Sequence, residues 1–156
     1  MTYGRIPQRL EGLRAQLRDQ VLDGFVLFVT EGSNWEGAYY ISGFRGSSAT
    51  LLITHDEEIL ITDGRYTVQA EEQSRFEVVD QGQRQTLEVL KELLGARRLR
   101  RVGFEGERVS YALFKKLGYI DVKWIDSSSI IPSLRRCKDE LEVSCIRKAA
   151  AFAASA

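Results

Sequence analysis

Residues 25–30 form a near-continuous apolar run of about the length of one β-strand. A strand that faces water on one side alternates apolar and polar residues, whereas a strand covered on both faces is apolar throughout. This run therefore predicts a strand inside a sheet that has helices on both faces. The rest of the chain agrees, because short β-like segments alternate with segments whose apolar residues recur every three or four positions. We predict an α/β domain with a mixed β-sheet flanked by helices on both faces.

The other elements follow from periodicity and capping signals. A first helix carries leucines at three- and four-residue spacing, begins at Pro7 and is expected to end at Gly24. His55 lies in a polar turn between two apolar runs, which predicts an antiparallel hairpin of strands 49–54 and 58–62. Further strands are expected at 76–80, 101–105 and 122–125. Further helices are expected at 35–41, 65–73, 86–94 and 110–117. Ser33 and Glu36 would form a capping box for the first of these, and Asp63 would cap the second. Gly43 would end the first and Gly95 would end the third.

The charge balance and the lengths of the apolar runs argue against two kinds of partner. The 156 residues include 22 Lys and Arg against 22 Asp and Glu, so no broad basic field is available to hold nucleic acid. The one basic run, residues 97–101, follows a predicted helix C-terminus, where cations oppose the helix dipole. No apolar run approaches the roughly 20 residues that cross a bilayer. We expect neither a nucleic-acid partner nor a membrane partner.

The cysteines and the N-terminus indicate the compartment. Cys137 and Cys145 are too few for a disulfide framework, which fits a reducing environment. The first residues lack the apolar stretch of a secretory signal. We expect a cytoplasmic protein.

The sequence contains few groups arranged for catalysis. Its only histidine, His55, lies more than eighty residues from either cysteine, so no zinc-ligand spacing results. Ser47 and Ser48 lack the surroundings of a nucleophile elbow, and the chain has no phosphate-binding loop. The acidic groups at 71–72, 105–107 and 139–142 lie among Arg or Lys and are expected on solvated faces. We expect no catalytic residue, no metal and no cofactor in this chain.

Residues 138–156 predict a final helix with an uncovered apolar face. Every residue there tolerates a helix, no residue stops it, and Leu141, Cys145, Ala149 and Phe152 share one face. Because such a face needs another surface to cover it, the helix is expected to be cut short. The alternative is a natural C-terminal helix that docks on its own sheet.

Two stretches combine an arginine with aromatic residues and glycines at the end of a predicted element. They are residues 39–46, which contain Arg45, and residues 62–66, which contain Arg65. At such places backbone and side chain can both reach a ligand. The alternative is a structural ion pair, such as Asp63 with Arg65, that supports a turn.

These stretches resemble a known family. Residues 40–44 (Tyr-Ile-Ser-Gly-Phe), the apolar strand after them and residues 62–66 (Thr-Asp-Gly-Arg-Tyr) are similar to the amino-terminal domain of the Xaa-Pro aminopeptidase, prolidase and creatinase family. Residues 136–149 resemble the segment that joins this domain to the first helix of the catalytic domain. The resemblance covers nearly the whole chain.

The resemblance implies a division of labour between two domains. It implies a carboxyl-terminal "pita-bread" domain, beyond Ala156, in which two Asp, one His and two Glu bind two divalent metals, commonly manganese, cobalt or zinc. Residues 1–135 are then the non-catalytic N-terminal domain, and residues 136–156 are the linker and the start of the first catalytic-domain helix. Short Xaa-Pro peptides would be the substrates of the parent hydrolase, and a homodimer is expected. Aminopeptidase, dipeptidase and creatinase-like substrates stay open.

The resemblance also suggests site residues. Arg45 is expected to face substrate, and Tyr40 and Phe44 are expected to form the wall beside it. The structural support of the site is assigned to three residues of the second stretch: Asp63, Arg65 and Tyr66. Two alternatives stay open: a stand-alone α/β binding or interaction module without a peptidase partner, and a family member that lost peptidase activity and only binds.

Overall fold

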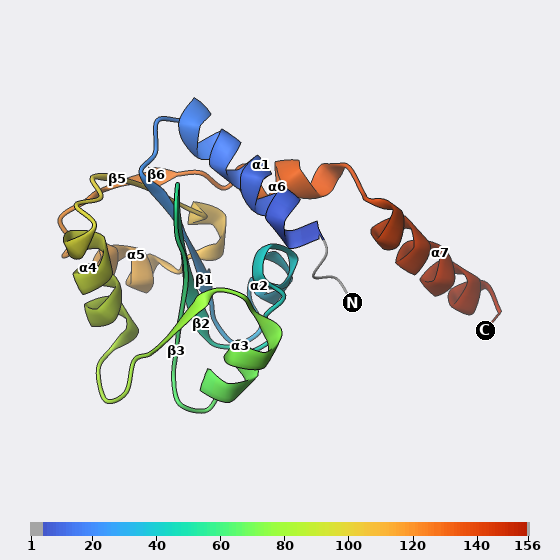
Figure 1. The fold of residues 1–156 in the computed structure, drawn as a ribbon, viewed down its shortest axis with the longest axis horizontal. Helices are drawn as coiled ribbons and strands as arrows, with labels where there is room; N and C mark the ends of the chain where they lie inside the picture. Colours follow the sequence, from blue (N-terminus) through green and yellow to red (C-terminus); the bar gives the residue numbers. More distant parts are fainter. Residues whose placement is uncertain (1–4, 156) are drawn as a thin grey trace.

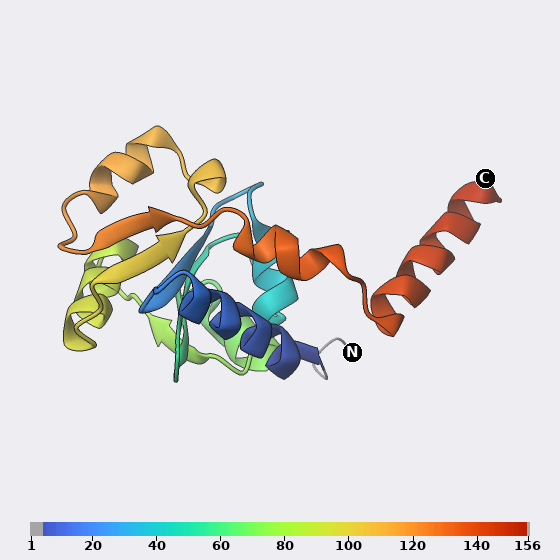
Figure 2. The same cartoon turned by 90° about the horizontal axis from the view of Figure 1, so that it is seen from above.

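The computed structural model describes residues 5–155 as a six-stranded sheet with helices on both faces (Figures 1 and 2). The strand order is β4-β3-β2-β1-β5-β6. The strands are β1 (Gly24–Val29), β2 (Ala49–Thr54), β3 (Glu58–Thr62), β4 (Glu77–Asp80), β5 (Arg101–Phe104) and β6 (Lys123–Asp126). The helices are α1 (Ile6–Asp19), α2 (Trp35–Ser42), α3 (Thr67–Gln73), α4 (Thr86–Ala96), α5 (Tyr111–Leu117), α6 (Ile130–Arg136) and α7 (Glu140–Ala154), with a 3₁₀ turn at Gly106–Arg108.

The sheet is mixed, as the sequence predicts. Strand β2 runs antiparallel to β1 and β3, and the pairs β1–β5, β3–β4 and β5–β6 are parallel. All six residues of β1 are buried, which confirms a strand covered on both faces. The hairpin around His55 is also confirmed, with Ile53 paired to Glu58.

Side chains of β1 alternate between two apolar cores, one on each face of the sheet. Phe25 and Leu27 pack with residues of α1, α2, α3 and α6, whereas Val26 and Phe28 pack with residues of α4 and α5. The alternation follows from the two-residue period of a strand. Each face therefore has its own set of helices, as expected.

Two helices end differently from the prediction. Helix α1 ends at Asp19 and not at Gly24. The Leu22 N–H donates to the Leu17 carbonyl at 2.8 Å, and Val21, between the helix and Leu22, has a φ of 54°. This is a Schellman ending, in which the residue at the left-handed position is usually glycine. Gly24 instead begins β1, where a Cβ would lie 3.1 Å from the Ile53 carbonyl oxygen.

Helix α4 ends in the same way. It continues through Gly95, and Arg98 takes the left-handed conformation with a φ of 54° while the Leu99 N–H donates to the Leu94 carbonyl at 3.1 Å. The prediction that Gly95 ends the helix is therefore wrong. Gly43, by contrast, is confirmed as the left-handed end of α2, with a φ of 84°.

Two predicted caps are also wrong. The N-cap of α2 is Asn34, with a φ of 64°, and Ser33 with Glu36 forms no capping box. Helix α3 begins at Thr67 because residues 63–66 form a hydrogen-bonded turn, so Asp63 does not cap it. Helix α6 was not predicted; it packs against α1 and contributes Ile130 to the core.

Helix α7 projects away from the body of the domain (Figures 1 and 2). None of its residues is buried, and Leu141, Ile146 and Phe152 are 51%, 54% and 77% exposed. The expected uncovered apolar face is present, and the helix does not dock on its own sheet.

Candidate functional site

The two stretches singled out in the sequence meet in the structure. Residues 39–46 cover the end of α2 and the segment after it, and residues 62–66 begin with the last residue of β3. Ser47 and Ser48 directly follow the first stretch. The ring of Phe44 contacts the ring of Tyr66 edge-on at 6.2 Å between centroids, and the hydroxyl groups of Ser47 and Tyr66 lie 2.7 Å apart. The Thr62 hydroxyl donates to the Ser48 carbonyl at 2.8 Å. The two stretches thus form one surface region next to α2.

Arg45 lies on the outside of this region. Its backbone N–H donates to the side-chain oxygen of Gln73 at 3.0 Å, and its guanidinium lies 5.3 Å from the centre of the Tyr39 ring. The side chain is exposed and borders a cavity of about 420 Å³ between the body of the domain and α7. The cavity is lined by Arg9, Trp35, Glu36, Tyr39, Tyr40, Arg45, Arg135, Leu141, Glu142 and Cys145.

Tyr40 and Phe44, expected as a pair, lie in different surroundings. Tyr40 lines the cavity, and its hydroxyl donates to the Leu134 carbonyl at 3.0 Å. Burial raises the pKa of that hydroxyl. Phe44 is fully buried in the core, because its ring fills the space beside Gly46, where a Cβ would come within 2.1 Å of it. Phe44 is therefore not exposed beside Arg45 and does not line this cavity.

Asp63 and Arg65 form a two-pronged ion pair. The Arg65 Nε donates to one carboxylate oxygen of Asp63 at 2.8 Å and a terminal nitrogen donates to the other at 3.0 Å. The hydrogen bond and charge of Arg65 lower the pKa of Asp63. The Arg65 guanidinium also lies 5.4 Å from the centre of the Tyr66 ring. These contacts lie within the hydrogen-bonded turn of residues 63–66, directly before α3.

A cluster around Arg9 was not predicted. The Arg9 side chain, only 7% exposed, donates to the Tyr40 carbonyl at 2.9 Å and to Asp139 at 3.0 Å, and lies 3.6 Å from Glu142. Its guanidinium stacks 4.1 Å from the centre of the Tyr40 ring. The pKa of Asp139 is lowered by the backbone N–H of Glu142, which it caps, and next by Arg9. We call Arg9 with Asp139 and Glu142 the α7 latch.

The α7 latch corrects the expectation that the acidic residues at 139–142 lie on a solvated face. Asp139 and Glu142 are part-buried cap residues and not fully solvated charges. The spacing Asp-x-x-Glu before a helical run is a capping-box signal that was available in the sequence. Their partner, 130 residues earlier in the chain, was not readable from any local pattern.

Glu105, also expected on a solvated face, is 5% exposed. The side-chain amide of Asn34 donates to its carboxylate at 2.5 Å and to the Phe28 carbonyl at 3.3 Å. Burial is the main cause that raises the pKa of Glu105, and the Asn34 hydrogen bond opposes it. The Asn34 side chain thereby links β1 with the residue that follows β5.

Metal ligands do not gather in the described part of the chain. Among residues 5–155, no three His, Cys, Asp or Glu side chains are placed to hold one ion. The residues present therefore do not fit the pair of divalent metals that the family resemblance implies. None of the helices in the same range has the length and apolarity needed to cross a membrane.

The fold and the two joined stretches define a class of protein: an α/β domain with a six-stranded mixed sheet. The Creatinase/Prolidase N-terminal domain family matches residues 9–137, and the chain belongs to that family.

Individual relatives agree with this assignment. The chain is 27% identical over 148 residues to the uncharacterized peptidase YqhT of Bacillus subtilis, covering 93% of this chain and 40% of the relative. The X-Pro aminopeptidase structure from Thermotoga maritima aligns with a TM-score of 0.80 and 33% identity, covering 86% of this chain and 38% of that one. The N-terminal domain of the cytoplasmic peptidase PepQ from Mycobacterium tuberculosis aligns with a TM-score of 0.68 and 30% identity, covering 81% of this chain and 98% of that one.

The chain thus spans about 40% of the length of YqhT and of the T. maritima enzyme. It corresponds to the N-terminal domain of Xaa-Pro peptidases.

Proposed function

We propose that this chain is the non-catalytic N-terminal domain of a metal-dependent Xaa-Pro peptidase, either an aminopeptidase or a dipeptidase. Its role is to narrow the entrance for short Xaa-Pro peptides and to contribute to a homodimer. The metals, manganese, cobalt or zinc, are held by a catalytic domain that follows α7. The parent enzyme is cytoplasmic, like the PepQ peptidase named above.

The observation that carries the proposal is the arrangement of α7 and Arg45. Helix α7 presents an uncovered apolar face, and it is fixed to the domain by a buried arginine rather than by apolar packing. A helix of this kind is suited to pack on a second domain, because its exposed apolar area is otherwise unfavourable in water. Arg45 borders the cavity on the same side of the domain.

Arg45 has the chemistry to bind a peptide substrate. A guanidinium can donate paired hydrogen bonds to a carboxylate or to a carbonyl oxygen. Arg45 makes no ion pair within the described residues, so these donors are available. In this proposal Tyr40 forms the wall of the cavity, while Asp63, Arg65 and Tyr66 hold the neighbouring turn in place.

The experiment measures hydrolysis of a Gly-Pro or Xaa-Pro peptide by the enzyme in which the catalytic domain follows residue 156. Arg45→Ala is expected to lower kcat/KM by roughly ten- to a hundred-fold, the effect of losing one charged hydrogen bond, with an unchanged melting temperature. Arg75→Ala is the control, because Arg75 is exposed and lies outside the cavity. A lower melting temperature with normal kcat/KM would assign Arg45 to the fold and not to substrate.

A second arm tests the division of labour. The 156-residue chain, incubated with manganese, cobalt or zinc, is expected not to cleave the Xaa–Pro bond of these peptides. Metal-dependent turnover by this chain alone would contradict the proposal. A reading frame without metal-ligand residues after Ala156 would favour the stand-alone binding module.

A further inference from the structure

A second cavity, of about 270 Å³, lies at the end of α4 and is separate from the Arg45 region. It is bordered by the last turns of α4, by the loop that leads into β5 and by the loop that leads into β6. Three cations line it: Lys91, Arg98 and Arg100, with Asp121 as the one carboxylate. Its floor is apolar, because Leu94 and Ile120 are 1% and 6% exposed.

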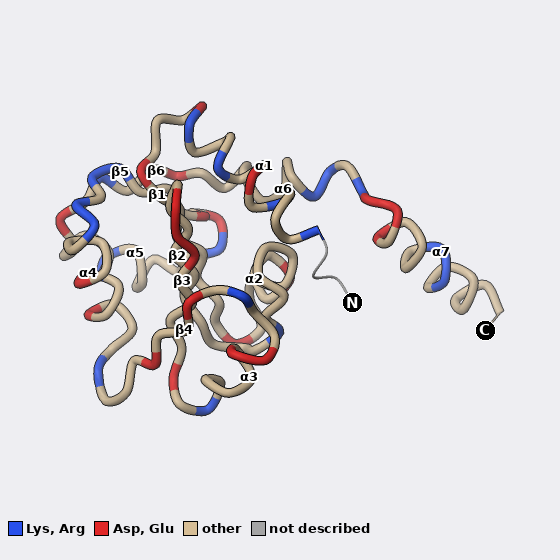
Figure 3. The backbone as a smooth tube through the Cα atoms, viewed as in Figure 1, with Lys and Arg blue, Asp and Glu red and all other residues tan. Residues whose placement is uncertain are grey.

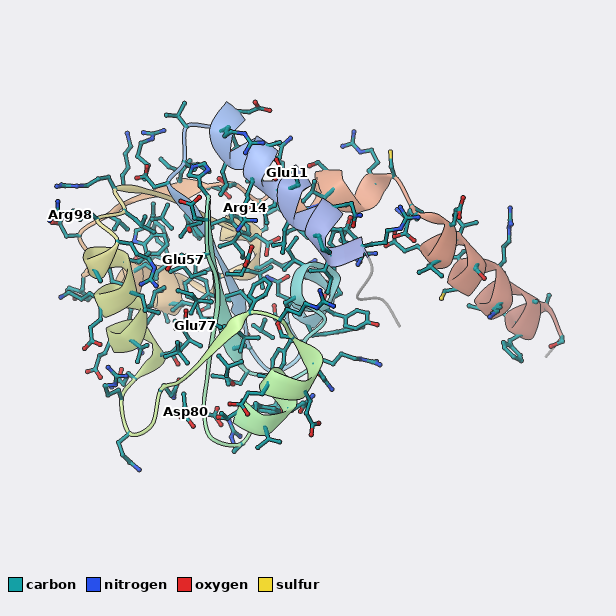
Figure 4. The ribbon with its side chains drawn as sticks, viewed as in Figure 1. Glu11, Arg14, Glu57, Glu77, Asp80 and Arg98 are labelled. Carbon is teal, nitrogen blue, oxygen red and sulfur yellow. The ribbon has the colours of Figure 1, made fainter. Side chains whose placement is uncertain are left out.

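The three cations form no ion pair within residues 5–155. Their neighbours in the basic run are occupied: Arg97 pairs with Glu57 at 2.5 Å, and the Arg101 Nε donates to the Val21 carbonyl at 2.8 Å. Figure 3 shows basic residues gathered between α4 and β5. Figure 4 shows Arg98 at the outer edge of the molecule beside α4. Like charges around one cavity repel one another, and an anion relieves that repulsion.

Arg98 is held there against its backbone preference. It occupies the left-handed position of the Schellman ending of α4, with a φ of 54°. Glycine takes this conformation without strain, whereas a residue with a Cβ does not. A strained residue that lines a cavity and carries an exposed charge is a candidate for function.

Gly95 is a second residue at this cavity that lowers the stability of its own helix. It lies inside α4, where glycine weakens a helix relative to alanine. No packing requires it, since a Cβ at this position would meet no atom within 4 Å. Gly95 keeps one wall of the cavity free of a side chain. Arg98 and Gly95 both lower local stability, and both line this cavity. We take this as a sign that the cavity serves a ligand.

We propose that this cavity binds a small organic anion, a phosphate monoester with an apolar body. Arg98 and Arg100 hold the anionic group through hydrogen bonds, Lys91 adds a point charge, and the apolar body lies on Leu94 and Ile120. The volume is just below the range of about 300–1,000 Å³ in which drug-sized molecules bind, which suits a small ligand. The site does not depend on the proposed peptidase role.

The test titrates the 156-residue chain with phenyl phosphate, inorganic phosphate and benzyl alcohol, followed by calorimetry. Phenyl phosphate is expected to bind at least tenfold more tightly than either of the others, because only it combines the charge and the apolar body. Its affinity is expected to fall severalfold between 50 and 300 mM NaCl, since the cations are exposed. Absence of phenyl phosphate binding at millimolar concentration would overturn the proposal.

Two variants separate the site from general charge attraction. Arg98→Gly is expected to weaken phenyl phosphate binding at least tenfold while raising the melting temperature by about 2–4 °C, because the strained backbone is relieved. Gly95→Leu keeps every charge but fills the cavity, and it is expected to abolish binding without unfolding the domain.

Val21→Gly is the matched control. Val21 occupies the same left-handed position at the end of α1, with the same φ of 54°, and does not line this cavity. It is expected to raise the melting temperature similarly and to leave the affinity unchanged. If Arg98→Gly binds like the wild type, or if Gly95→Leu still binds, the cavity is not an anion site.

Discussion

The α7 latch gives a quantitative prediction about stability. Arg9→Met removes the guanidinium but keeps an unbranched stem of similar shape. The change leaves the Tyr40 carbonyl without its donor at 2.9 Å, and it removes the stacking on the Tyr40 ring at 4.1 Å. A hydrogen bond from a charged donor contributes about 1.5–3 kcal/mol, and a desolvated cation–π contact contributes up to about 2 kcal/mol.

The acidic partners reduce the total cost. Breaking a fully buried ion pair costs about 3–5 kcal/mol, but Asp139 and Glu142 are 17% and 26% exposed and can be hydrated. Asp139 also keeps its hydrogen bond from the Glu142 backbone N–H at 2.9 Å. We therefore expect Arg9→Met to lower the free energy of unfolding by about 3 kcal/mol, a large fraction of the usual stability of a domain.

Urea denaturation followed by far-ultraviolet circular dichroism measures this loss as a shift in midpoint at constant slope. Arg18→Met is the control on the same helix, because Arg18 and its partner Glu11 are 54% and 67% exposed. The control is expected to have the wild-type midpoint. Equal midpoints for Arg9→Met and Arg18→Met would refute the reasoning, since the buried contacts of Arg9 would then contribute nothing measurable.

Two further predictions concern Glu105 and α7. Burial raises the pKa of Glu105 above its ordinary 4.5, so the folded state keeps this proton to a higher pH than the unfolded chain does. The free energy of unfolding therefore falls as the pH rises from the unfolded-state pKa to the folded-state pKa. Urea titrations from pH 4 to 7 are expected to show this fall in the wild type and not in Glu105→Gln; an unchanged slope in the variant would contradict the assignment. In hydrogen exchange, the amides of residues 145–155 are expected to exchange much faster than those of β1, because α7 has no tertiary cover here. Strong protection that does not depend on protein concentration would show that α7 docks on its own domain.

The sequence predicted those parts of the fold that depend on local periodicity. The apolar run of β1, the hairpin around His55 and the left-handed end of α2 at Gly43 were all readable, because each follows from a pattern within about ten residues. Helix α6 was missed because it is short and contains Pro132. The proline lies in the first turn, where a missing N–H is tolerated, and the helix is held by packing on α1.

Helix ends and buried charges could not be predicted for a different reason. Gly24 and Gly95 were expected to end helices, yet Val21 and Arg98 occupy the left-handed positions in spite of their side chains. Glu105 appeared solvated from its neighbours in sequence, but its burial depends on Asn34, 71 residues away. Contacts of this range are fixed by the assembled sheet and leave no local signal.

For the same reason, the candidate site was only partly predicted. The stretches around Arg45 and Arg65 were recognised from their composition, and the structure brings them together through Phe44 and Tyr66. The burial of Phe44 was not foreseen, because an aromatic residue beside glycines reads as exposed until the fold shows that its ring fills the space next to Gly46.

Because the α7 latch joins the helix to the domain at its first turn, a small rotation there moves the far end of the helix the most. Phe152 lies thirteen residues beyond Asp139, which is about 20 Å along a helix axis. A tilt of about 10° at the latch would therefore carry Phe152 through roughly 3 Å, whereas residues near Arg9 would scarcely move. Small adjustments in the first helix of the chain are magnified at the far end of the last one. A substitution in α1 can then change the direction of the α7 axis even where it leaves the body of the domain unchanged.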